Sequence, residues 1–354
     1  MATAAHLMQQ AGFAFTREPG LRRPVPVIML SDAALALLRD VFGNAALFAD
    51  KPRIDCRVVK WGSAEAVAMP HGAVIVSEGD LADVLDMFPR GNEPAASSAQ
   101  PDRAKLNEPA ASSAQPDRAK LNIQHSNDFN ADFAIHAMPP FPEAEMLRFG
   151  ERLSATARVT LKADAPARTC WIEAVDAGWL FLIPDGYGHA WLLAVGGAPQ
   201  ALAQSAPLIG PLIESLEPAG GQFDTSPRML AKLAGDGWLA CGTAAIAFDP
   251  ICGDGTAQAA REGILAAGVI GALARGEEPS ELATHYHSLL LASLRRHLQL
   301  SLPFYANGGA GPWWHEQYAA AREGYDRTTA LLSRLPEPRF ALHGFDLIRR
   351  GQAA

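Results

Sequence analysis

The segment that most constrains this chain is residues 238–260, which read WLACGTAAIAFDPICGDGTAQAA. An apolar run ends at Gly242, a rigid Asp-Pro pair follows at 249–250, and Gly253 and Gly255 stand directly before an alanine-rich stretch. This order predicts a strand, a turn and a helix start, because proline fixes the backbone and glycine lets a ligand approach it closely. The free N–H groups at such a helix start favour negative charge. We therefore expect an anion-binding helix N-terminus or, as the alternative, a packed core helix with a glycine-rich entry.

The composition excludes several classes of function. The 354 residues suffice for two or three domains, and 30 basic against 38 acidic residues give a net charge of −8. The sequence has no basic run interleaved with aromatic residues, so a nucleic-acid partner is not expected. The four cysteines lack C-x-x-C spacing, which argues against structural zinc and a disulfide framework and favours a reducing, cytoplasmic compartment. We find no secretion signal and no apolar run near the roughly 18 residues of a membrane span.

A perfect duplication stands in the first half of the chain. The segment NEPAASSAQPDRAKL occupies 92–106 and recurs without change at 107–121. Its proline, serine and charge content cannot bury a core, and two short copies do not make a solenoid. We expect a flexible insertion over 90–128, with a recognition tether as the alternative reading.

Hydrophobic periodicity predicts a mixture of helices and strands. A helix capped by Ser31 is expected over 31–42, and antiparallel strands separated by Gly/Asp turns are expected between 155 and 196. Further helices are expected over 198–216, 279–300 and 313–333.

One of the expected strands carries aromatic side chains at alternate positions. In GWLFLIP (178–184), Trp179 and Phe181 share one face, and Trp191 lies on the next strand. These three side chains could wall an aromatic pocket, or the strand is an ordinary amphipathic core strand.

These motifs resemble a known group of flavoproteins. WLACGTAAIAFDPICGDGT resembles the second FAD motif of the p-hydroxybenzoate-hydroxylase fold, which is a strand, GDAA, a DP pair and G-x-G before a helix. GWLFLIP resembles the halogenase signature W-x-W-x-I-P, with Phe181 in place of the second Trp. Tyr305, Trp313, Trp314 and Tyr325 resemble the tail of the branch that holds tryptophan halogenases and geranylgeranyl reductases. The chain looks most similar to flavoproteins that hydroxylate a tryptophan of a partner protein during quinone-cofactor maturation.

The resemblance implies an α/β (α+β) fold, in which an antiparallel-sheet substrate domain interrupts an FAD-binding Rossmann-like domain and a helical tail follows. The expected divisions are 1–50, 129–150 and 231–275 for the FAD-binding domain, 51–89 for connecting strands and a helix, 90–128 for the insertion, 151–230 for the substrate domain and 276–354 for the tail.

The resemblance also implies FAD as the cofactor and hydroxylation of an aromatic compound as the reaction. The helix start would face the pyrimidine edge of the flavin and stabilise its reduced anion. The residues assigned to the cofactor are Glu18, Gly242, Thr243, Asp249, Pro250, Gly253, Asp254, Gly255 and Thr256. Trp179, Phe181 and Trp191 would form the wall of the substrate pocket. The substrate would be a small aromatic molecule or an aromatic residue of a partner protein. A flavin reductase or NAD(P)H would supply electrons; no catalytic residue and no metal are assigned.

The chain departs from the family pattern in three places. It contains no G-x-G-x-x-G, and it begins within what resembles the helix after that motif. We therefore expect the first strand and glycine loop upstream of Met1, in the same reading frame. Thr243 replaces the family's Asp, and residues 136–139 (HAMP) replace its D-A-T-G.

These departures leave two other functions open. One is a non-catalytic flavoprotein scaffold that has lost its dinucleotide site. The other is a flavin-dependent halogenase or an enzyme like the geranylgeranyl reductases. Lys60 lies in a different context from the catalytic lysine of halogenases, so hydroxylation is favoured over halogenation.

Overall fold

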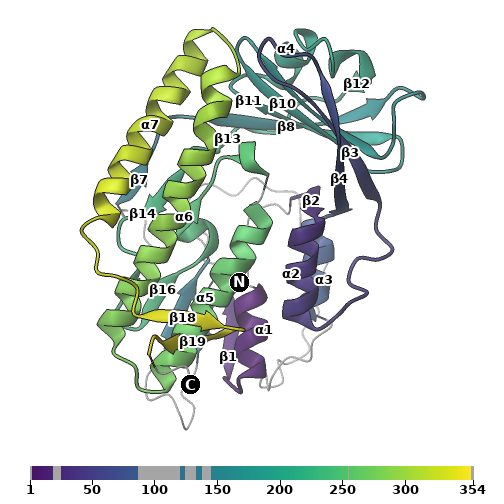
Figure 1. Ribbon diagram of the computed structural model, residues 1–354. Helices are drawn as coiled ribbons and strands as arrows, with labels where there is room; N and C mark the ends of the chain where they lie inside the picture. Colours follow the sequence, from purple (N-terminus) through teal and green to yellow (C-terminus); the bar gives the residue numbers. More distant parts are fainter. Residues whose placement is uncertain are drawn as a thin grey trace, which may run out of the picture.

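The computed structural model describes residues 2–18, 25–86, 120–123, 133–137, 145–253 and 255–351, and it has a mixed α/β fold (Figure 1). A large sheet crosses the top of the molecule in Figure 1, with α4 above it and the long helices α5, α6 and α7 reaching it from below. The helices are α1 (Ala2–Gln10), α2 (Asp32–Phe42), α3 (Glu78–Asp86), α4 (Pro199–Gln204), α5 (Gly255–Ala274), α6 (Pro279–Asn307) and α7 (Pro312–Leu332).

The large sheet has nine strands and is antiparallel except where β3 pairs with β9. Its order is β12-β8-β11-β10-β9-β3-β4-β2, with β13 paired to β8. The strands are β2 (Ile28–Ser31), β3 (Arg53–Lys60), β4 (Val67–Val76), β8 (Leu153–Leu161), β9 (Thr169–Val175), β10 (Gly178–Pro184), β11 (His189–Val195), β12 (Ile213–Leu216) and β13 (Phe223–Asp224). The antiparallel strands expected between 155 and 196 are thus β8 to β11.

The second sheet has five strands in the order β1-β5-β6-β16-β15. Its strands are β1 (Phe15–Glu18), β5 (Lys120–Ile123), β6 (Phe133–His136), β15 (Ala234–Gly235) and β16 (Trp238–Ala240). The strands β6 and β16 run parallel, whereas β5 lies between β1 and β6 and is antiparallel to both. The expectation of flexibility throughout 90–128 was therefore wrong for residues 120–123, because their backbone pairs on both sides; residues 90–119 and 124–128 lie outside the described ranges.

Two small sheets complete the fold. One joins β7 (Met146–Arg148), β14 (Arg228–Leu230) and β17 (Ile246–Ala247). The other is the hairpin of β18 (Phe340–His343) and β19 (Asp346–Arg349), which packs on α5. No helix in the described ranges is long and apolar enough to cross a membrane.

Local signals explain where α2 begins and ends. The Ser31 hydroxyl accepts a hydrogen bond from the backbone N–H of Ala34 at 3.2 Å, which satisfies one free donor of the first turn. Gly43 ends the helix with φ of +60°, a conformation that favours glycine. The helix predicted over 31–42 is confirmed.

The helix predicted over 198–216 was wrong beyond residue 204. A short 3-10 turn at Gly210–Leu212 and the strand β12 replace its second half. Pro207 and Pro211 lack backbone N–H groups and cannot continue a helix. The N–H groups of Leu208 and Ile209 bind the buried carboxylate of Glu173 instead of helical carbonyls.

Each face of the large sheet packs against a different part of the molecule. Leu180 and Leu182 of β10 point into a core under α4. Trp179 and Phe181 alternate with them and point into the main core, which also includes residues of α5 and α6. We call the face with Trp179 and Phe181 the inner face of the sheet.

Removing one copy of the repeat, residues 107–121, should leave the melting temperature almost unchanged. The shortened chain still reads AKLNI at the junction, so the sequence of β5 is retained. Halving a loop alters its closure free energy by only about 0.6 kcal/mol. Calorimetry of both proteins checks this, with Asn122→Pro as a destabilising control because proline removes an N–H from a strand paired on both sides. A loss of more than several degrees in the deletion variant would show that the repeat packs against the body.

Candidate functional site

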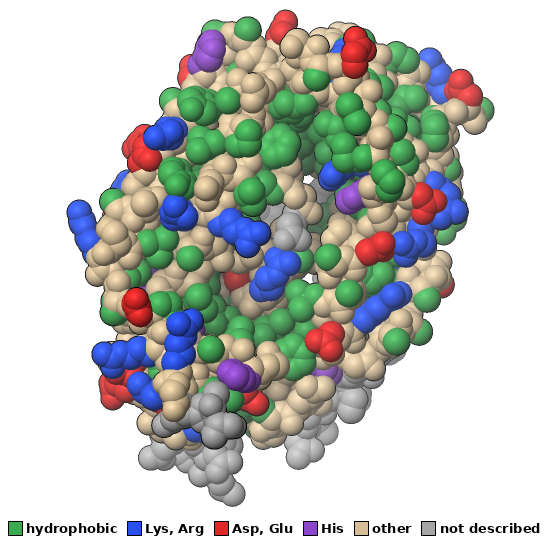
Figure 2. Space-filling view, in the orientation of Figure 1, with side chains coloured by type: hydrophobic (Ala, Val, Ile, Leu, Met, Phe, Trp, Pro, Cys, Tyr) green, Lys and Arg blue, Asp and Glu red, His purple; other side chains and the backbone are tan. Residues whose placement is uncertain are grey.

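The helix start predicted from the glycine turn is present and faces open space. The helix α5 begins at Gly255, and Gly253 before it has φ of +65°. A Cβ atom added at Gly253 or Gly255 would meet no atom of the protein within 4 Å. Figure 1 shows α5 rising toward the underside of the large sheet, and Figure 2 shows the middle of this side of the molecule hollowed out. We call this depression the central hollow.

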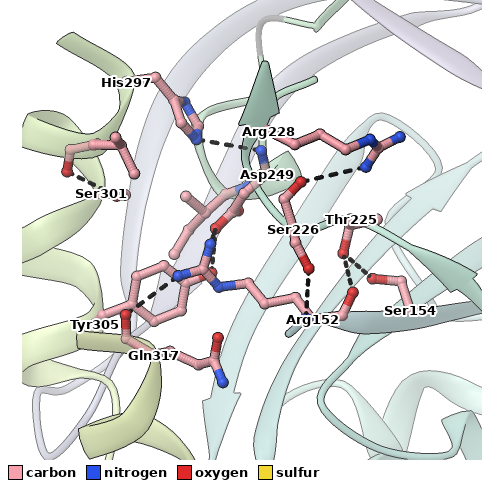
Figure 3. Close-up of polar contacts among 12 residues, drawn as sticks. Arg152, Ser154, Thr225, Ser226, Arg228, Asp249, His297, Ser301, Tyr305 and Gln317 are labelled. Carbon is pink, nitrogen blue, oxygen red and sulfur yellow. Dashed lines mark hydrogen bonds and ion pairs between the residues drawn. The ribbon is translucent and has the colours of Figure 1, made fainter. Parts of the chain in front are cut away.

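The carboxylate of Asp249 fixes the turn that precedes α5 (Figure 3). Its Oδ1 accepts a hydrogen bond from the N–H of Ile251 at 2.7 Å, and Pro250 starts a 3-10 turn there. Its Oδ2 accepts the phenolic O–H of Tyr305 and lies 3.1 Å from Nη1 of Arg152. Asp249 is 2% exposed, so its carboxylate is buried among these protein partners and holds the turn from the core side.

Arg152 is a fully buried cation that balances Asp249. Its guanidinium stacks over the ring of Tyr305, with 4.4 Å between the guanidinium carbon and the ring centroid. Its backbone N–H donates to the hydroxyl of Ser226 at 2.9 Å, and its Nη2 donates to the carbonyl of Gln317 at 3.2 Å. Removing one member of such a pair leaves the other charge buried without compensation, which is strongly destabilising.

The imidazole of His297 supports the same turn by binding its backbone. The N–H of Asp249 donates to Nε2 of His297 at 3.2 Å, and the imidazole stacks on Phe248 with ring centroids 4.5 Å apart. Burial lowers the pKa of His297 to about 4. The ring is therefore neutral at pH 7, and Nε2 is free to accept this hydrogen bond.

A second turn, at Gly242 and Thr243, lies beside α5. The N–H of Gly242 donates to Oε2 of Glu262 at 2.7 Å, and the exposed Thr243 donates its hydroxyl to the carbonyl of Ala137 at 3.2 Å. Tyr286 donates its phenolic O–H to the carbonyl of Ala240 at 2.6 Å. Burial raises the pKa of Glu262 to about 8, so this carboxyl is mostly neutral at pH 7.

The three aromatic residues predicted to line a pocket share the inner face of the sheet. Phe181 pairs with Leu193 and Ile183 pairs with Trp191, which puts the strands β10 and β11 in one register. Trp179 is buried beside Trp61, with ring centroids 6.2 Å apart. Phe181 is also buried, whereas Trp191 is only half-buried.

Several predicted residues lie away from this arrangement or outside the described ranges. Glu18 ends β1 in the five-stranded sheet, where its backbone pairs with Lys120. Asp254 is outside the described ranges, as are Met138 and Pro139. Pro250 and Thr256 flank the glycine turn as expected.

The sequence reasoning missed Arg152, His297 and Glu262. Nothing near Arg152 in the sequence marks it, because its partners come from distant segments. Glu262 had a usable signal: it stands in an alanine- and glycine-rich helix at a position flanked by buried residues. A carboxyl group there needs a hydrogen-bond donor.

No protein-family model and no curated protein matches the sequence. Solved structures do match the fold. The peptidyl tryptophan dihydroxylase QhpG, essential for tryptophylquinone cofactor biogenesis, has a TM-score of 0.66 at 19% identity, over 89% of this chain and 75% of that one. The flavin-dependent halogenase CmlS has a TM-score of 0.67 at 14% identity, over 97% of this chain and 72% of that one. HpxO of Klebsiella pneumoniae, solved with FAD, has a TM-score of 0.54 at 12% identity, over 94% of each chain.

These comparisons confirm the fold expected from the resemblance. The chain has the fold of flavin-dependent halogenases and hydroxylases, with a large sheet over one end and long helices in the last third of the chain. At identities below 20%, the likeness concerns the fold.

The protein should lose stability as the pH rises from about 4.5 towards 8, and Glu262→Gln should remove this loss. The carboxyl is neutral in the folded state up to about pH 8 but ionises near 4.5 when unfolded. A group with a raised folded pKa stabilises at low pH, and its contribution disappears as the pH rises through that pKa. The full span is on the order of 5 kcal/mol. Urea denaturation of both proteins across this range measures it; parallel curves for the two would contradict the assignment.

Through His297, the protein should lose stability as the pH falls, which is the opposite of the effect of Glu262. The folded pKa is about 4 against 6.5 for an ordinary histidine, so the contribution is present above 6.5 and is lost as the pH falls toward 4. The difference is on the order of 3 kcal/mol. His297→Gln, whose amide oxygen can still accept from Asp249, should flatten this limb in urea denaturation. The exposed His315, changed to Gln, is the matched control and should leave the limb unchanged.

Proposed function

We propose that this chain is an FAD-dependent monooxygenase that hydroxylates an aromatic substrate. The observation that carries the proposal is the start of α5, where two exposed glycines leave the helix N-terminus open beneath an aromatic sheet face. The fold supports the proposal, since QhpG and CmlS are described as a tryptophan dihydroxylase and a flavin-dependent halogenase.

The residues at this helix start fit the flavin end of FAD. The open space at Gly253 and Gly255 is the space that a side chain would fill, so a planar ring could approach the backbone there. The N–H groups of Gly255 and Thr256 have no partner within the helix and would stabilise negative charge on the pyrimidine edge. Asp249 and Pro250 would keep the turn rigid, and Asp254 belongs to the same proposed set.

When bound, FAD would supply the activation of oxygen. The part of this chain is to orient the aromatic ring and to exclude water from the reacting atoms. Trp179, Phe181 and Trp191 on the inner face would form the apolar wall for the substrate. Gly242 and Thr243, held by Glu262 and Ala137, would lie along the cofactor where related flavoproteins have a carboxylate.

A second candidate function rests on the five-stranded sheet. In a dinucleotide-binding βαβ unit, a strand with a glycine loop lies beside the strand that ends in the ribose-binding acid, here Glu18. In this protein β5 occupies the position next to β1, and the sequence contains no G-x-G-x-x-G. This arrangement favours a scaffold that no longer binds the dinucleotide, and a cofactor titration separates the two functions.

The remaining parts of the proposal concern the substrate, the electron donor and the cellular compartment. The substrate would be a small aromatic molecule or an aromatic residue of a partner protein, as for QhpG. A flavin reductase or NAD(P)H would deliver the electrons. The cysteine usage fits the cytoplasm.

FAD titration by quenching of flavin fluorescence tests the proposal. Wild type should bind FAD, and Gly255→Leu should abolish binding because the branched side chain fills the space for the ring. Thr243→Asp should tighten binding by roughly tenfold, because a carboxylate accepts charge-assisted hydrogen bonds from a cofactor hydroxyl. Gly79→Leu is the matched control, since Gly79 is an exposed glycine in the first turn of α3 and should leave binding unchanged.

Two results would overturn the proposal. Equal binding by wild type, Gly255→Leu and Thr243→Asp would mean that FAD lies elsewhere. A folded wild type that binds no FAD would favour the scaffold.

A further inference from the structure

The strands around the inner face are nearly free of acidic residues. The strands β3, β4, β8, β9, β10 and β11 contain only two carboxylates, Asp55 and Glu173. Asp55 is exposed and pairs with Arg168 at 2.6 Å. Glu173 pairs in register with Leu180, whose side chain points into the core under α4. Its carboxylate binds the N–H groups of Leu208 and Ile209 on that side. From Arg57 onward, these strands therefore place no carboxylate on the inner face, and Asp55 before it is already paired.

Two basic side chains lie together at this part of the sheet. Arg57 pairs in register with Cys170 and with Met69, and Cys170 belongs to the main core. His71 stands two residues after Met69, at a bulge where two residues of β4 lie opposite one residue of β3. Burial, and next the charge of Arg57, lower the pKa of His71, so the two groups are within electrostatic reach of each other.

The nitrogen atoms of these two residues are not satisfied by the described residues. Nε of Arg57 and Nε2 of His71 have no hydrogen-bond partner there, and Nη2 of Arg57 donates only to the weakly accepting sulfur of Met69 at 3.5 Å. The carboxylate whose charge acts on the pKa of His71 is that of Asp32. This carboxylate is exposed and pairs with Arg53 at 2.8 Å. Arg57 therefore offers a positive charge and a free N–H donor, and His71 adds an unpaired ring nitrogen.

Apolar side chains adjoin this basic pair. Four apolar residues of the inner face lie in register across the strands β3, β9, β10 and β11, namely Val59, Ile172, Phe181 and Leu193. Val59, Ile172 and Leu193 are half-buried, so part of their surface is open to a ligand. Figure 2 shows hydrophobic, Lys/Arg and His side chains, with a few Asp/Glu side chains, around the central hollow. The surface matches a molecule with an aromatic ring and an anionic group at one end.

We propose that Arg57 and His71 bind the carboxylate of a free aromatic acid whose ring lies against Ile172 and Phe181. The inference rests on the proposed function for its catalytic meaning, but the binding it states is measurable without FAD. It selects a small molecule over an aromatic residue within a protein, because a residue inside a polypeptide has no free carboxylate near its ring.

Calorimetric titration with three indole compounds tests the inference. The probes are indole-3-acetate, the neutral indole-3-acetamide and N-acetyl-tryptophanamide, which mimics a residue within a chain. Wild type should bind the acetate at least tenfold more tightly than either amide, because charge-assisted hydrogen bonds to the carboxylate are lost in both. Arg57→Gln should remove the preference without changing amide binding, and Arg57→Lys should keep part of it.

Arg158→Gln is the matched control. Arg158 pairs with Trp191 on the same face, but it lies on β8, four strand spacings or about 19 Å from β3. Its removal should leave the preference intact. Equal binding of acid and amides, a preference that survives Arg57→Gln, or a preference lost in Arg158→Gln would each overturn the inference.

The FAD titration keeps this result separate from the proposed function. Arg57→Gln should bind FAD as wild type does; a parallel loss of FAD would assign Arg57 to the cofactor and overturn the substrate subsite. A wild type that prefers the acid but binds no FAD would remove the monooxygenase and leave the subsite standing.

Discussion

The arrangement of this molecule depends on the buried pair of Arg152 and Asp249. Asp249 belongs to the turn before α5, Arg152 precedes β8 of the large sheet, and Tyr305 of α6 lies between them. One ion pair therefore joins the sheet, the helix start and the C-terminal helices. Because both charges are fully buried, loss of either one would leave the other uncompensated, so the packing of the three parts is coupled to this pair.

That connection places two unlike surfaces opposite each other. The N-terminal start of α5 offers backbone N–H groups and, at its glycines, no side chains. The inner face of the sheet offers apolar and basic side chains. The first suits a flat cofactor with developing negative charge, and the second suits an aromatic molecule. Two neutral groups, His297 and the protonated Glu262, also support these turns at pH 7, and the charge of Asp249 is balanced by Arg152.

The sequence was informative where the signal was local. The start of α5 could be predicted because proline and glycine restrict the chain at that point, and the strands β8 to β11 because turn residues separate them. The second half of 198–216 was misjudged because Pro207 and Pro211 were given less weight than the apolar pattern. The end of α6 was placed too early: the helix continues through Pro303 to Asn307, where Gly308 and Gly309 make room for the indole of Trp314. Arg152 could not be found, since its partners lie far along the chain and only the fold brings them together.

The strand β5 has a consequence for how the gene can change. Its residues Lys120, Leu121 and Asn122 repeat Lys105, Leu106 and Asn107, because each copy of the duplicated segment ends in Lys-Leu and is followed by Asn. Gain or loss of a whole copy by replication slippage would thus always leave the same strand sequence before Ile123. A change in copy number would therefore leave the residues of this strand in the five-stranded sheet the same.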